Sequence, residues 1–469
     1  MQNQSGVEIP LSGKKRNIVT AGSALIMLGI FMNSTGFAVI LRKLLTTMDA
    51  LPYFTLITLL RSTASTIMTP ISGKLIDLFG LKKVTIVGGI MCVITSLGLS
   101  QANSVMVICI MAFLNNLSYG TMVPIPYTIV RKIHERKDVS RANGYISSAV
   151  AIGSFAGGII AGKFADMNLL QFAILFPLIP ELLAVLLVAG NIPRHERKQQ
   201  KTYIDIPGIL LMSTGISALL ISLNYGGRIG WGNPYVLAGL AGAVVLIILF
   251  ISVELKSPGP IIPISLFSRK QYTVSLIVGG LCYYYFNAMN SYGPYVVQSV
   301  LGVSATVSGS LLLPRTIITM ALPAFVGTWV GKQKCNLWKA MAISTTLVTL
   351  SFIPLAFTSP STPLMVFLVA FAITGIAESF RSVSITPSAQ DALDASNMGV
   401  GTSIVNFVNT LSMAIAAATN GIILDSFPDN VSAGVRIIFT ITSLTSFAAL
   451  LIVVFVMRKI HTAKSSDQP

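Results

Sequence analysis

Apolar runs of about 20 residues, the length of helix that spans a bilayer, recur along the whole chain between short charged or Gly/Pro-rich gaps. The pattern predicts fourteen membrane-spanning helices. We expect them near residues 18–41, 50–72, 84–102, 104–130, 143–165, 168–191, 206–225, 234–255, 272–299, 304–331, 338–357, 362–388, 398–425 and 432–457.

The composition agrees with a chain that lies mostly within a membrane. Of the 469 residues, 53% are apolar and only 10% are charged, whereas about a quarter of the residues of a soluble protein are charged. The mean hydropathy is +0.77. Fourteen crossings use roughly 300 residues, so no sizeable soluble domain is expected. The predicted fold is an all-α polytopic membrane protein.

Lysine and arginine gather in alternate gaps between the runs, at 14–16, 74–83, 131–141, 194–201, 256–270, 332–339 and 458–464. Short loops rich in these residues stay in the cytoplasm, which places these gaps and both termini inside. The formal charge of +16 then follows from topology and does not indicate a nucleic-acid partner. A site for anionic lipid or a protein at 131–141 is the alternative interpretation, but the orientation rule alone accounts for that run.

The residue types that bind metals or form disulfides are few and scattered. The four cysteines lie far apart and the three histidines fall in predicted loops or the tail. We therefore expect no metal site and no cofactor, and an enzyme is not favoured. The sequence contains no GxxxxGK[ST] segment, so we do not expect direct use of ATP. No apolar run precedes about Ile18, so we expect no removable signal peptide.

A glycine-rich basic loop, GKLIDLFGLKK, follows the second run at residues 73–83. Gly73 allows two helices to approach closely, Asp77 suits interaction with a helix N-terminus or an arginine, and Gly80 suits the turn. With Lys82, these residues resemble the signature gating loop of the major facilitator superfamily. The gap at 327–332 resembles a degenerate copy and implies two related halves.

Further segments resemble the fourteen-helix drug:proton antiporter branch of that superfamily, which includes tetracycline and quaternary-ammonium exporters. Gly153, Gly157 and Gly158 resemble its antiporter motif, with Ala156 in place of the customary proline. Asp205-Ile206-Pro207-Gly208, Gly230-Trp231-Gly232, and Glu254 with the prolines after it resemble the inserted helix pair and its exit.

The resemblance implies two six-helix halves with two inserted helices. The expected division is 1–191 for the N-terminal half, 192–271 for the inserted pair and its linkers, 272–457 for the C-terminal half and 458–469 for a cytoplasmic tail. It also implies a monomeric secondary transporter of a bacterial plasma membrane, which exports amphipathic drugs or toxic organic compounds by alternating access in exchange for protons.

At two places the sequence departs from the family pattern in residues associated with proton coupling, which weakens the expectation of that mechanism here. Asn33 stands where the family commonly has aspartate, and residues 113–120 lack the arginine that helix four normally carries. The runner-up hypothesis is a transporter of one charged metabolite, peptide or lipid without the usual proton coupling. A non-transporting receptor or enzyme is the third.

Five charged residues fall near the centres of predicted helices: Glu181, Glu378, Arg61, Arg315 and Arg381. Each costs at least about 2.5 to 3.5 kcal/mol at the bilayer centre, so we expect them to face a cavity or each other. Glu378 and Arg381 share a helix face and serve either as a packing pair or in substrate or proton binding, so Glu378 is one of two proton-coupling candidates. For Glu181, which has no basic residue within a turn, we favour a proton-coupling role, with Arg61 as a candidate partner.

Polar and aromatic residues on several predicted helices suit a pocket for an amphipathic small molecule. The candidates, besides the arginines, are Asn33, Asn115, Asn116, Tyr119, Tyr284, Asn287, Tyr292, Asn406 and Asn409. Packing or an interfacial belt is an equally weighted interpretation of the tyrosines. Aromatic faces favour a cationic ligand, whereas three buried arginines favour an anionic or zwitterionic one.

Overall fold

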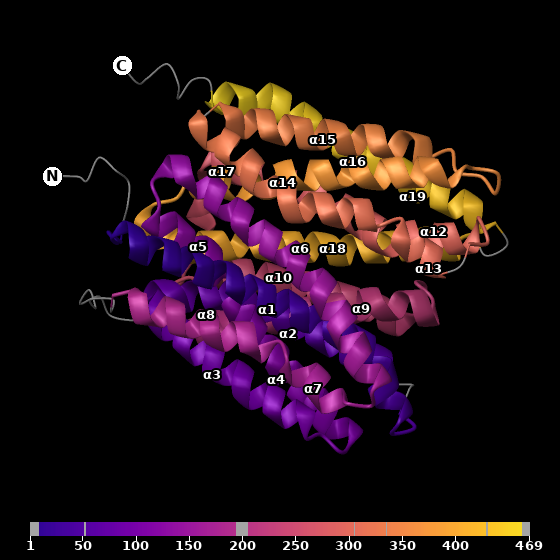
Figure 1. Ribbon diagram of the computed structural model, residues 1–469, viewed down its shortest axis with the longest axis horizontal. Helices are drawn as coiled ribbons and strands as arrows, with labels where there is room; N and C mark the ends of the chain where they lie inside the picture. Colours follow the sequence, from indigo (N-terminus) through magenta and orange to yellow (C-terminus); the bar gives the residue numbers. More distant parts are fainter. Residues whose placement is uncertain are drawn as a thin grey trace.

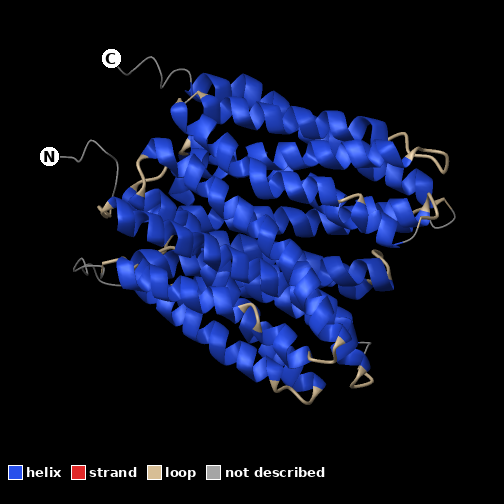
Figure 2. Cartoon of the chain, viewed as in Figure 1, coloured by secondary structure: helices blue, strands red, loops and turns tan. Residues whose placement is uncertain are grey.

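The computed structural model describes residues 9–50, 53–193, 205–303, 305–333, 335–427 and 430–461. Within these residues every regular element is a helix (Figure 2). The basic cluster at 194–201 and the tail beyond residue 461 lie outside the described residues.

The first six crossings correspond closely to the six predicted runs. Proline begins a new helix within two of them, at Pro124 and just after Pro177, because it cannot continue the hydrogen bonding of the preceding turn. The helices are α1 (Gly13–Thr46), α2 (Phe54–Phe79), α3 (Leu81–Ser100), α4 (Val105–Met122), α5 (Pro124–Ile133), α6 (Arg136–Asp166), α7 (Leu170–Leu175) and α8 (Leu178–Asn191).

The eight later crossings also follow the predicted runs. The next two helices are α9 (Ile206–Ile229) and α10 (Pro234–Glu254). The remaining elements are η2 (Ile264–Ser268), α11 (Lys270–Asn287), η3 (Ala288–Tyr292), α12 (Gly293–Ser299), α13 (Ala305–Ser310), α14 (Leu313–Lys332), α15 (Asn336–Leu355), α16 (Leu364–Ser382), α17 (Ile385–Gln390), η4 (Ala395–Asn397), α18 (Met398–Asp425), α19 (Val431–Ile452) and η5 (Val453–Met457).

Twelve helical segments among the described residues are long and apolar enough to cross a membrane. The less apolar crossings α2 and α11–α12 bring the number to the predicted fourteen, so the all-α polytopic fold is confirmed. Large apolar side chains of α10, such as Leu237, Val244 and Ile248, are exposed, as expected for a helix that faces lipid.

The first residues of α1 and the last of η5 lie at the same end of the bundle (Figure 1). We call this the basic end, and define it by residues 74–83, 131–141 and 391–400. From there α3 and α4 diverge from α15 and α16 towards the opposite end (Figure 1). The inserted helices α9 and α10 share a hydrophobic core with α2, α11 and α18.

A carboxylate joins the two groups of helices at the basic end. The two oxygens of Asp77, at the end of α2, accept hydrogen bonds from the backbone N–H groups of Gly399 and Val400, each at 2.9 Å. These N–H groups belong to the first turn of α18, where the helix dipole favours a negative charge. Gly80, with φ of 83°, then turns the chain into α3.

Ion pairs reinforce this junction. Asp391, just after α17, accepts from Arg131 of α5 at 3.2 Å and from Arg136 of α6 at 2.5 Å. The Asp391 side chain is 4% exposed. A pair this well shielded from water keeps more of its Coulomb attraction than a surface pair does.

Backbones of α6 and α14 also touch near the basic end. A Cβ atom on Gly144 would lie 2.5 Å from the carbonyl oxygen of Pro323, and one on Gly327 would lie 2.3 Å from that of Ser140. Gly331, the residue at the position of Asp77 in the degenerate copy, has no room for a side chain beside Lys137. The expected domain boundaries at residues 191, 271 and 457 stay a prediction.

We expect Gly144→Ala to lower the thermal unfolding midpoint in detergent, because its methyl group meets main-chain atoms that cannot move aside. Overpacking of this kind costs about 1–3 kcal/mol. Gly158→Ala on the same helix is the matched control, since nothing lies within 4 Å of its Cβ position. Equal midpoints for the two variants would contradict the close contact of α6 and α14.

Candidate functional site

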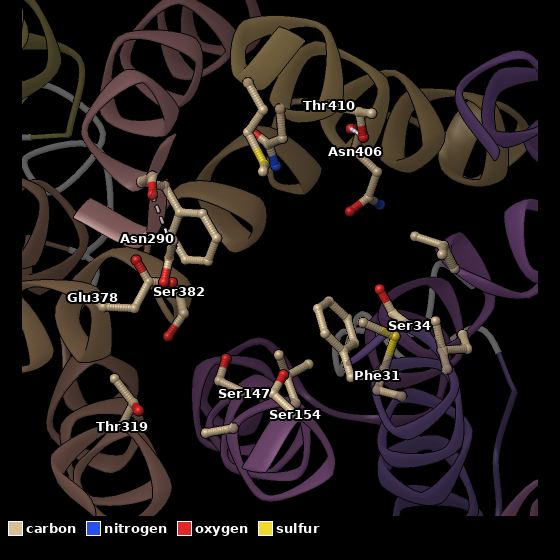
Figure 3. Close-up of a pocket in the computed structure, with 18 of the residues that line it drawn as sticks. Phe31, Ser34, Ser147, Ser154, Asn290, Thr319, Glu378, Ser382, Asn406 and Thr410 are labelled. Atoms are coloured by element: carbon tan, nitrogen blue, oxygen red, sulfur yellow. Dashed lines mark hydrogen bonds between the residues drawn. The ribbon is translucent and has the colours of Figure 1, made fainter. Parts of the chain in front are cut away.

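A cavity of about 490 Å³ lies between the two groups of helices. Its lining comes from α1, α2, α4, α5 and α6 on one side and from α11, η3, α14, α16 and α18 on the other. Figure 3 shows Phe31 and Ser34 across the open space from Asn290 and Glu378, with Asn406 on a third side. The volume is within the range of small-molecule pockets.

Nine of the predicted residues meet in this cavity. They are Asn33, Arg61, Asn116, Tyr119, Arg315, Glu378, Arg381, Asn406 and Asn409.

Arg61 enters the cavity from α2 with a neutral partner. Its Nη2 donates to Oδ1 of Asn33 at 2.9 Å, and its guanidinium lies 3.9 Å from the centre of the Phe37 ring. An amide oxygen and an aromatic face both stabilise a cation without neutralising it. Arg61 therefore keeps its full positive charge.

Arg315 enters from α14 and is 9% exposed. Its Nε and Nη2 have no hydrogen-bond partner among the described residues, and its guanidinium lies 5.4 Å from the centre of the Phe286 ring. A buried guanidinium without acceptors is costly. Nε and Nη2 of Arg315 are thus free to donate hydrogen bonds to a ligand.

Glu378 and Arg381 of α16 form a bidentate pair. Nε of Arg381 donates to Oε2 of Glu378 at 2.8 Å and Nη2 donates to Oε1 at 2.5 Å. The hydroxyl of Tyr285 also donates to Glu378, and Arg381 stacks over Tyr283 at 4.4 Å. Pairing is therefore observed, although both side chains also line the cavity.

Glu181 of α8 lies outside the cavity lining and is 4% exposed. Its side chain occupies the space beside Gly29 of α1, where a Cβ would lie 2.3 Å from Cγ of Glu181. Neither carboxylate oxygen has a hydrogen-bond partner among the described residues. Its polar neighbour is Tyr119, which does line the cavity. Arg61, the candidate partner, instead bonds to Asn33.

Four predicted residues point elsewhere. Asn115 donates to Thr95 and Ser96 at 3.1 and 3.0 Å. Tyr284 bonds to Thr419 and Asn420, and Asn420 donates to Asn287. Tyr292 packs edge-on against Tyr295. The contacts of Asn115, Tyr284 and Asn287 join neighbouring helices, and none of the four residues lines the cavity.

Several lining residues were not among the candidates, including Tyr127 and Thr319. Ser147 and Ser154 of α6 also face the cavity (Figure 3). Their spacing of seven residues places them on one helix face, a signal that could have identified this side of the lining.

The glycine motif of α6 brings that helix against α1. Cβ atoms on Gly153 and Gly157 would lie 2.4 and 2.5 Å from the carbonyl oxygens of Leu28 and Met32, whereas Gly158 is unobstructed. In the loop at 73–83, Gly73 packs against Gly399, and Lys82 donates to the Ile192 carbonyl at 3.2 Å.

A multi-pass bundle with a polar cavity between two groups of helices is the architecture of a membrane transporter. The sequence pattern of the Major Facilitator Superfamily matches residues 19–417. The chain belongs to this superfamily, as the loop at 73–83 predicted.

Similar proteins include known exporters. The multidrug transporter protein MdtP of Bacillus subtilis (strain 168) is 24% identical over 424 residues, covering 89% of this chain and 76% of MdtP. The multidrug export protein EmrB of Haemophilus influenzae is 24% identical over 365 residues, covering 76% of this chain and 70% of EmrB. These matches agree with the drug:proton antiporter branch.

The solved structures support the same fold. The human organic anion transporter MFSD10 superimposes with a TM-score of 0.66 at 14% sequence identity, covering 93% of this chain and 99% of that one.

We expect Glu378→Gln to destabilise the protein by about 3–5 kcal/mol, because it leaves Arg381 without its counter-ion in a poorly solvated site. The double variant Glu378→Gln/Arg381→Met removes both charges and should recover most of the loss. Thermal unfolding in detergent, followed by circular dichroism, measures both effects. A single variant as stable as the parent, or a double variant less stable than the single one, would show that the pair does not act as a unit.

Proposed function

We propose that this transporter is a secondary active exporter of a bacterial plasma membrane, which moves amphipathic organic molecules by alternating access around the central cavity. The observation that carries the proposal is that both groups of helices line the cavity and that contacts such as Asp77 with α18 join them at the basic end. The multidrug exporters among its relatives support efflux as the direction.

The side of the membrane follows from charge. Loops rich in lysine and arginine stay in the cytoplasm, so the basic end and both termini face inwards in this proposal. The described conformation is then closed towards the cytoplasm. Inward opening requires Asp77 to release the first turn of α18 and Asp391 to release Arg131 and Arg136.

We further propose that protons drive export through Glu181. Its carboxylate has no cation or hydrogen-bond partner among the described residues, so its charge is free to change. Tyr119 lies between this carboxylate and the cavity, which gives protonation a route to influence a bound substrate. Glu378 is less suitable, because Arg381 stabilises its ionised form.

The histidine at the basic end is a poor proton carrier. Burial, together with the nearby Arg16, lowers the pKa of His134 to about 4. Its ring nitrogen Nε2 lies 2.7 Å from the hydroxyl of Thr20. At neutral pH this imidazole is uncharged and links α1 to the end of α5.

The transport of one charged metabolite is the second candidate function. It is favoured by Arg61 and Arg315, which line the cavity without a carboxylate partner.

We expect Glu181→Gln to abolish transport driven by a pH gradient in proteoliposomes, while exchange without a gradient persists, because the amide cannot carry a proton. A panel of ethidium, 1-naphthoate and 1-naphthamide supplies the probes. Glu135→Gln is the matched control, since Glu135 pairs with Lys137 at the surface of the basic end.

Gradient-driven transport that survives Glu181→Gln would reject this carboxylate as the carrier. If the double variant Glu181→Gln/Glu378→Gln also retains it, the protein is a uniporter or uses another ion.

A further inference from the structure

The charged groups that line the cavity are unequal in number. They are Arg61, Arg315, Arg381 and Glu378. Because Glu378 pairs with Arg381 through two hydrogen bonds, the charges of these two cancel. Two guanidinium groups remain, and the cavity therefore carries an excess of two positive charges.

The neighbour of Arg61, Asn33, does not neutralise its positive charge. The acceptor for Arg61 is the side-chain amide of Asn33, at a position where the resemblance predicts aspartate. The amide oxygen accepts one hydrogen bond from Arg61 but carries no negative charge. This single residue leaves Arg61 cationic at the wall of the cavity.

Arg315 presents a second cation from the opposite group of helices. Two of its nitrogens are buried without an acceptor in the described part of the chain. The hydroxyl of Thr319, one turn further along α14, donates to the Arg315 carbonyl. A carboxylate or sulfonate satisfies guanidinium donors with short, charge-assisted hydrogen bonds. The gain is large where water is scarce.

The remaining lining is suited to an aromatic body. Phe31 and Phe155 come from one group of helices and Tyr283 and Phe286 from the other. Ring faces and edges offer stacking contacts to an aromatic ligand. Phe286 also lies beside Arg315, so an apolar surface adjoins the cation.

We propose that the cavity selects aromatic organic anions, with the positive charges of Arg61 and Arg315 attracting the carboxylate or sulfonate group and the aromatic side chains holding the ring. This assignment rests on the proposed export function and specifies its substrate class. The two arginines come from different groups of helices, so both sides of the cavity contribute positive charge.

The test measures binding of three naphthalene probes to the full-length protein in nanodiscs by isothermal titration calorimetry. They are 1-naphthoate, neutral 1-naphthamide and cationic 1-naphthylmethylammonium, which share one ring system. We expect 1-naphthoate to bind at least about tenfold more tightly than the cation, as charged hydrogen bonds allow. Tighter or equal binding of the cation would overturn the proposal.

Substitutions then locate the anion. Arg61→Gln and Arg315→Gln should each weaken 1-naphthoate binding by about tenfold and leave 1-naphthamide binding unchanged. Asn33→Asp tests the same idea without removing an arginine, because the new carboxylate neutralises Arg61 and should also weaken binding. Lys163→Gln, at an exposed position of α6, is the control.

Size-exclusion chromatography identifies folded variants, and Asn33→Asp decides the matter if an arginine variant fails to fold. Unchanged 1-naphthoate affinity in the folded variants would overturn the assignment. Transport of the cation in proteoliposomes, without transport of 1-naphthoate, would reject anion selectivity but leave the exporter proposal intact. Neither binding nor transport of any of the three would reject both.

Discussion

The cost of placing a charge in hydrocarbon governs this structure. The outward faces of fourteen apolar helices can contact lipid, as that of α10 does. An arginine or glutamate at mid-membrane depth has to face the protein interior instead. Arg61, Arg315, Glu378 and Arg381 accordingly meet between the two groups of helices, where polar side chains surround them. Glu181 is the exception, because it is buried against α1 outside the cavity lining. The cavity thus holds the other four of these charges, and for the same reason it can hold a polar substrate.

Most surface charges lie at one end of the bundle and have a second role there. The basic loops contain Arg131 and Arg136, which pair with Asp391, and Asp77, which accepts hydrogen bonds from the first turn of α18. These contacts are strong but few, and each joins one group of helices to the other. Together with the close backbone contact of α6 and α14, these polar contacts join the two groups of helices at this end.

The helices could be predicted from sequence because each apolar run has the length that a bilayer requires, and all fourteen predicted ranges have a counterpart. The orientation of individual side chains could not. In α11, Tyr283 faces the cavity whereas Tyr284, the next residue, bonds to Asn420. Apolar residues lie on all sides of α11, so the periodicity of its sequence does not reveal which face points inwards. Glu181 was identified by its charge alone, but its place beside Gly29 depends on the packing of α1 against α8. The spacing of Glu378 and Arg381 left a packing pair and a binding role equally open, and their hydrogen bonds became known only from the structure.

The central claim is that opening at one end accompanies closing at the other around the charged cavity. Spin labels at exposed Lys83 and Lys332 report the basic end, and labels at Met167 and Val307 report the opposite end, in a background without the four cysteines. Distances in nanodiscs are measured by double electron–electron resonance at neutral and acidic pH, with and without 1-naphthoate. The account predicts that the basic-end distance lengthens whenever the opposite-end distance shortens. Two distances that change in the same direction, or a basic-end distance that never changes, would contradict it.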